Sequence, residues 1–115
     1  MTRCALHVNR AFSAQPTLRD QLGPDFDVHE LPLAEALAWH RPVELVWVSD
    51  GEPGTVAAVH AHFPDAALLA TLPRTASTAD VLEALALGAD LVLRDEGIVL
   101  AAAALAALGR RRQPA

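Results

Sequence analysis

Short apolar segments that alternate with helical segments constrain the fold of this chain more than any other feature of its sequence. Five runs have the length and apolar content of buried strands, at residues 4–8, 26–31, 45–48, 66–70 and 91–93. The segments between them carry helix-stopping residues such as Gly23, Pro64 and Gly88. Connections of this length allow only right-handed crossovers within one parallel sheet. The pattern therefore predicts an α/β domain of five βα units.

The character of each strand predicts its place in the sheet. Residues 26–31 alternate apolar and polar side chains, which is typical of an edge strand, whereas residues 45–48 are apolar on both faces, as in a central strand. Ser77, with Asp80 three residues later, indicates a capping box that opens the helix before Gly88. Other helices are expected over 13–22, 33–39, the segment before Pro64, and 98–108, which Gly109 ends. The expected fold is a three-layer, doubly wound sheet with the flavodoxin-like strand order 2-1-3-4-5.

Composition excludes several classes of protein. The 115 residues suit one domain, expected over 1–109 with a basic tail at 110–115. The longest apolar run, 98–108, is shorter than the ~20 residues that span a bilayer. With no leader pattern at the amino terminus, we expect a cytoplasmic protein without membrane contact. The net charge of −5 argues against nucleic-acid binding through this domain. Cys4 is the only cysteine, which excludes an internal disulfide and favours an apolar strand residue.

In a doubly wound sheet, functional residues gather at the carboxyl ends of the strands. These positions hold Asn9 and Arg10, then Ser49 and Asp50, then Thr71, then Arg94 and Asp95. This arrangement resembles the receiver domain of two-component response regulators over nearly the whole chain. The most specific stretches are 44–54 and 81–95, and the second is similar to the family's ALxxGAxxYLxK passage. Pro53 matches the family's proline four residues after the phosphoacceptor, if Ser49 occupies the acceptor position.

The resemblance implies chemistry whose parts are mostly missing here. In the family, an acidic pair and the acceptor aspartate hold Mg²⁺, while a lysine and a hydroxyl bind the phosphoryl oxygens. Asn9 and Arg10 replace the acidic pair, Ser49 replaces the aspartate, and the sequence contains no lysine. Only Thr71 matches. We therefore expect a pseudo-receiver that is neither an enzyme nor a cofactor or metal protein, with Asp50 left open as a displaced acceptor.

The expected function is phosphorylation-independent signalling through a protein partner. The resemblance points to the face formed by the helix before Gly88, strand 91–93 and helix 98–108, where a homodimer is expected. Leu100, Ala104 and Ala107 give helix 98–108 a second apolar strip. The helix then either lies deeper than its neighbours or meets a partner, unless the strip is simply exposed alanine-rich surface. A small-ligand-binding domain of flavodoxin-like fold is the alternative, although no glycine-rich phosphate loop follows the first strand. The arginines at 110–112 are either a solvated tail or a contact to DNA, an anionic membrane or a partner.

Individual residues of the altered pocket have their own expected roles. Thr71 either caps the turn after its strand or corresponds to the family's phosphate-sensing threonine. Arg10 or Arg94 is expected to form an ion pair with Asp50 or Glu52 in place of Mg²⁺, because the guanidinium fork suits carboxylates. Trp47 is expected to pack in the core or at its rim, and the histidines show no shared metal spacing.

Overall fold

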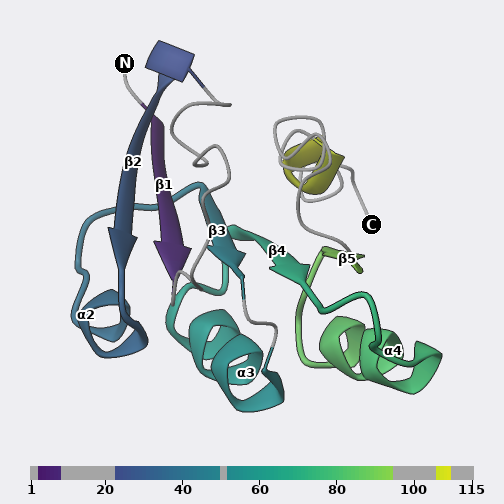
Figure 1. Cartoon of the computed structure of the whole chain (residues 1–115). Helices are drawn as coiled ribbons and strands as arrows, with labels where there is room; N and C mark the ends of the chain where they lie inside the picture. Colours follow the sequence, from purple (N-terminus) through teal and green to yellow (C-terminus); the bar gives the residue numbers. More distant parts are fainter. Residues whose placement is uncertain (1–2, 9–22, 50–51, 95–105, 110–115) are drawn as a thin grey trace.

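The computed structural model describes residues 3–8, 23–49, 52–94 and 106–109 and confirms the predicted sheet (Figure 1). The five strands pair in parallel in the order β2-β1-β3-β4-β5. They are β1 (Arg3–Val8), β2 (Phe26–Leu31), β3 (Leu45–Val48), β4 (Ala67–Thr71) and β5 (Leu91–Leu93). The alternating strand β2 lies at one edge and the fully buried β3 lies in the centre, as their sequences predict.

Helices occupy the connections between the strands. They are the 3-10 helix η1 (Gly23–Asp25) and the α-helices α2 (Leu33–Leu37), α3 (Pro53–His62) and α4 (Thr78–Ala86). The predicted helix at 13–22 lies outside the described residues. Of the last predicted helix, residues 106–109 are described and helical, so Gly109 continues this helix and does not end it. A difference of one residue at a helix end is common, because terminal turns fray.

Alternate side chains of the strands build two cores on opposite faces of the sheet. One core contains Leu45, Trp47 and Leu69, and it is covered by Ala107 and Leu108. The other contains Val46 and Val48 together with the buried apolar residues of α2 and α3, which are Ala36, Val56 and Val59. Figure 1 shows α2 and α3 on one side of the sheet and the helical residues 106–109 on the other. The result is the three-layer arrangement expected from the sequence.

Helix α4 is fixed at both ends. The predicted capping box is present: Ser77 Oγ accepts from the Asp80 amide at 3.1 Å, and Asp80 Oδ2 accepts from the Ser77 amide at 3.0 Å. Beyond its other end, Gly88 has a φ of +122°, a conformation that L side chains rarely adopt. A Cβ at this position would lie 2.3 Å from Cγ of the His60 ring in α3. Glycine therefore lets the chain turn closely past α3 into β5.

Two further observations bear on the expected class of protein. None of the helices within the described ranges is long and apolar enough to cross a membrane. Burial raises the pKa of the Cys4 thiol, and the negative charge of Asp27 raises this pKa further. The neutral thiol is thus favoured, in keeping with an apolar strand position.

Candidate functional site

Ser49, at the end of β3, is buried at the carboxyl edge of the sheet. It is only 5% exposed, and its amide donates to the carbonyl of Val8, at the end of β1, at 3.4 Å. Its carbonyl oxygen accepts from Thr71 Oγ1, at the end of β4, at 2.9 Å. The structure thus brings two of the predicted site residues into direct contact. Asn9, Arg10 and Asp50 lie outside the described residues.

The Thr71 hydroxyl is held from both sides. It donates to the Ser49 carbonyl and accepts from the indole Nε1 of Trp47 at 3.1 Å, and the residue is fully buried. A hydroxyl has a single hydrogen to donate, so its donor capacity is used within the protein. The interpretation of Thr71 as a cap for the turn after its strand is wrong. Its hydroxyl bonds instead to β3, because parallel pairing places the ends of β3 and β4 side by side.

Trp47 continues this line of contacts toward the other edge of the sheet. Its ring is 4% exposed and stacks on the His7 imidazole, with ring centroids 3.8 Å apart and planes inclined by 11°. His7 Nδ1 in turn lies 3.7 Å from Glu30 Oε2 in β2. Packing of Trp47 in the core is confirmed, although its link to Thr71 was not predicted. We call His7, Trp47, Thr71 and Ser49 the cross-strand row.

Arg94, which directly follows β5, turns toward α4. Its Nη2 atom donates to Thr78 Oγ1, in the first turn of α4, at 3.1 Å. Between residues that the structure describes, the expected ion pair of Arg94 with Glu52 is not formed. The Thr78 hydroxyl is within reach of the guanidinium and takes the place of a carboxylate. The other expected pairs, through Arg10 or Asp50, involve residues outside the described ranges.

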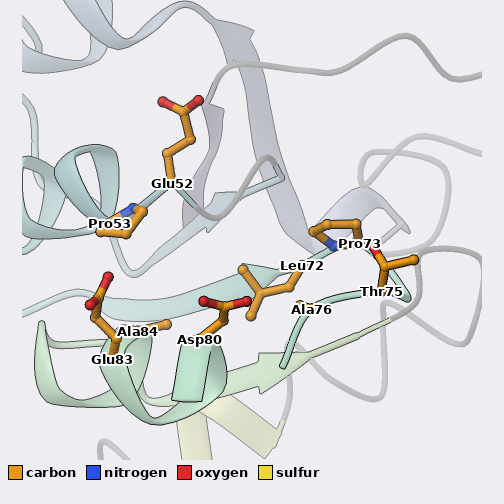
Figure 2. Close-up of a pocket in the computed structure, with 9 residues that line it drawn as sticks. All are labelled: Glu52, Pro53, Leu72, Pro73, Thr75, Ala76, Asp80, Glu83 and Ala84. Carbon is orange, nitrogen blue, oxygen red and sulfur yellow. The ribbon is translucent and has the colours of Figure 1, made fainter. Parts of the chain in front are cut away.

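The structure also contains a cavity of about 290 Å³ (Figure 2). It lies between the start of α3, the loop after β4, and α4. The buried side chains of Leu72 and Ala84 form its apolar part. Its remaining lining residues are Glu52, Pro53, Pro73, Thr75, Ala76, Asp80 and Glu83. Among the described residues that line this cavity, three carry carboxylates and none is basic.

A solved structure has the same arrangement of elements. It is the crystal structure of a response regulator from Burkholderia pseudomallei with a phosphorylated aspartic acid, a calcium ion and citrate. The TM-score is 0.61 at 19% sequence identity, over 92% of this chain and 66% of that chain. The chain has the receiver fold of response regulators. It spans slightly less than two thirds of that protein, and no family model or curated protein matches its sequence.

The receiver fold implies a Mg²⁺ site, and the residues of this chain do not fit one. Magnesium prefers carboxylate oxygens. In the correspondence predicted from the sequence, the acceptor position holds the buried Ser49 and the acidic-pair positions hold Asn9 and Arg10. No group of three His, Cys, Asp or Glu side chains within the described ranges could hold a metal ion. These three positions therefore offer no carboxylate to a metal ion.

Of the three residues expected at a partner interface, Ala107 alone lies within the described residues. Ala107 is fully buried in the core of its own chain, next to Leu108, so its assignment to an exposed strip is wrong. Alanine is small enough for either face of an apolar helix, which is why the pattern misplaced it. Leu100 and Ala104 lie outside the described residues. On α4, however, Leu82 is 60% exposed and Leu85 is 39% exposed.

Proposed function

We propose that this chain is a receiver-type regulatory domain that signals by binding a protein partner and does not depend on phosphorylation. The Thr71 hydroxyl carries the proposal. In a phosphate-sensing role this hydroxyl must donate its hydrogen to a phosphoryl oxygen. Here the hydrogen is already donated to Ser49, and Trp47 holds the oxygen from the other side.

Releasing that hydroxyl has an energetic cost. Reorientation would break two buried hydrogen bonds, and each buried polar group left unpaired costs about 1–3 kcal/mol. Ser49 adds a chemical obstacle, because a serine hydroxyl is a weak nucleophile without a base to take its proton. The sequence also has no lysine to bind the transferred oxygens. These features together support a domain held in one conformation.

The partner surface that we propose is the face formed by α4, β5 and the helix that contains residues 106–109. Leu82 and Leu85 support this choice, since both project from α4 with a large exposed fraction. Exposed apolar residues grouped on one element favour association. Association of two copies would most simply be an isologous two-fold dimer, in which each chain uses the same surface.

Attempted phosphorylation tests the chemical part of the proposal. The full chain is incubated with acetyl phosphate and Mg²⁺ and followed by intact-mass spectrometry, with a phosphorylation-competent receiver as positive control. We expect no adduct of ~80 Da, the mass that a phosphoryl group adds. An adduct mapped to Ser49 would refute the proposal. An adduct mapped to Asp50 would refute it as well, and would establish Asp50 as a displaced acceptor.

A further inference from the structure

We propose that the cavity between α3 and α4 is a docking pocket for one arginine side chain of a protein partner. The proposal rests on the proposed function, because it describes how the partner of this domain is recognised. It concerns a different surface from the exposed leucines of α4.

The size and apolar part of the cavity fit a single long side chain. Its volume of about 290 Å³ is at the lower limit of the ~300–1,000 Å³ typical of small-molecule sites, which argues against a nucleotide or flavin. Leu72 and Ala84 are buried beneath it, and Pro53 and Pro73 add apolar wall. Arginine buries its aliphatic stem against such a surface while its charged end stays at the polar rim.

The charge of the lining residues selects a cation. Glu52, Asp80 and Glu83 contribute three carboxylates. Two helices, α3 and α4, begin beside the cavity, and each amino terminus carries about half an elementary positive charge. The carboxylates exceed this partial positive charge, and the net charge of the chain is also negative, at −5. An anionic ligand is therefore disfavoured despite the two helix ends.

The carboxylates of α4 are suitably placed for a guanidinium group. Figure 2 shows Asp80 and Glu83 on the side of α4 that faces Pro53, whereas the carboxylate of Glu52 points away from α4. The capping box holds Asp80 in position through Oδ2, and a carboxylate can accept further hydrogen bonds. A planar guanidinium can donate to two carboxylates at once. Arg94, a nearby cation of this chain, contacts Thr78 and does not line the cavity.

The test uses arginine amide as the probe, with citrulline amide as a control of nearly the same shape that lacks only the guanidinium charge. Amide chemical shifts of the full chain are followed at low ionic strength, without Mg²⁺ or a phosphoryl donor. We expect saturable shifts confined to residues 52–54 and 72–84 with arginine amide, and none with citrulline amide. Glu83→Gln should weaken binding about two- to fivefold, the range for an exposed ion pair. Glu35→Gln removes the same charge from an exposed position on α2, outside the cavity, and should leave binding unchanged.

Two results would overturn the proposal. One is equal binding of the two amides, which would show that charge plays no part. The other is an equal loss of affinity in Glu35→Gln and Glu83→Gln, which would indicate a diffuse attraction to an acidic surface. Neither depends on phosphorylation. A phosphorylated chain that still binds arginine amide would contradict the proposed function alone, and an unphosphorylated chain that does not bind it would contradict the pocket alone.

Discussion

The cross-strand row and helix α4 differ in almost every physical respect. The row is buried, and its polar groups meet one another: the Trp47 indole, the Thr71 hydroxyl and the Ser49 carbonyl are linked by hydrogen bonds. Helix α4 is anchored by a capping box and by Gly88, while Leu82 and Leu85 face outward. One region is buried and internally hydrogen-bonded, and the other offers exposed apolar surface.

This difference bears on how a receiver fold can lose one function and keep another. Phosphate chemistry needs exposed carboxylates and a hydroxyl that is able to reorient. Binding needs only a surface of fixed shape, which anchored helices provide. Under the proposed function, the hydrogen bonds of the cross-strand row take the place of the phosphate-sensing contacts, and the outer helices are unchanged. The following substitutions test each region separately.

Gly88→Ala should have the largest effect, because it tests the anchoring of α4. A φ of +122° is strained for alanine, at about 1–3 kcal/mol, and the new Cβ would meet the His60 ring. We expect the free energy of unfolding in urea to fall by at least this amount. Gly54→Ala in α3 is the matched control, since a Cβ there meets nothing within 4 Å. It should be neutral or stabilising by up to ~1 kcal/mol. Equal effects of the two substitutions would show that α4 does not depend on the close turn at Gly88.

Thr71→Val tests the cross-strand row at nearly constant side-chain volume. It leaves the buried Trp47 indole without its acceptor, at a cost of about 1–3 kcal/mol. Thr71→Ser keeps the hydroxyl and should lose only the buried methyl group, about 0.8 kcal/mol. The variants are compared by urea unfolding at one pH.

A double-mutant cycle with Trp47→Phe isolates the bond between these two residues. The coupling energy should be at least ~0.5 kcal/mol, as for groups in direct contact. Additive effects would mean that the indole and hydroxyl stabilise the fold independently, and the row would then not be a unit.

The sequence predicted some of these features and missed others for identifiable reasons. The strand order followed from apolar runs and short connections, and the capping box followed from Ser77 and Asp80, which are close in sequence. The bond between Trp47 and Thr71 joins residues 24 positions apart. It depends on the pairing of β3 with β4, which places Trp47 opposite Leu69 and brings Thr71 diagonally near. Local sequence patterns carry no such information. They misplaced Ala107 for a different reason, because alanine is small enough for either face of an apolar helix.

Ser77→Ala should have a moderate effect, because it removes the amino-terminal cap of α4. Loss of a serine cap typically costs about 1 kcal/mol. We expect that decrease in unfolding free energy together with faster hydrogen exchange of the amides in the first turn of α4. Thr75→Ala, in the same loop but outside the capping box, should change stability by less than ~0.5 kcal/mol. Unchanged exchange at the Asp80 amide in Ser77→Ala would show that its bond to Ser77 is not needed to hold the helix end.

Leu82→Glu should have the smallest effect on stability and the clearest effect on assembly. Because Leu82 is 60% exposed, we expect the free energy of unfolding to change by less than ~0.5 kcal/mol. If α4 belongs to an isologous interface, a carboxylate at this position faces the partner in both copies, and each interface then contains two unfavourable charges. Light scattering at tens of micromolar should therefore give a dimer for the parent and a monomer for the variant. Leu37→Glu places the same charge on α2, where Leu37 is 36% exposed, and should leave the dimer intact. A monomeric parent would instead contradict the assignment of α4 to an interface. Leu82 would then be one of the single exposed leucines that are ordinary on protein surfaces.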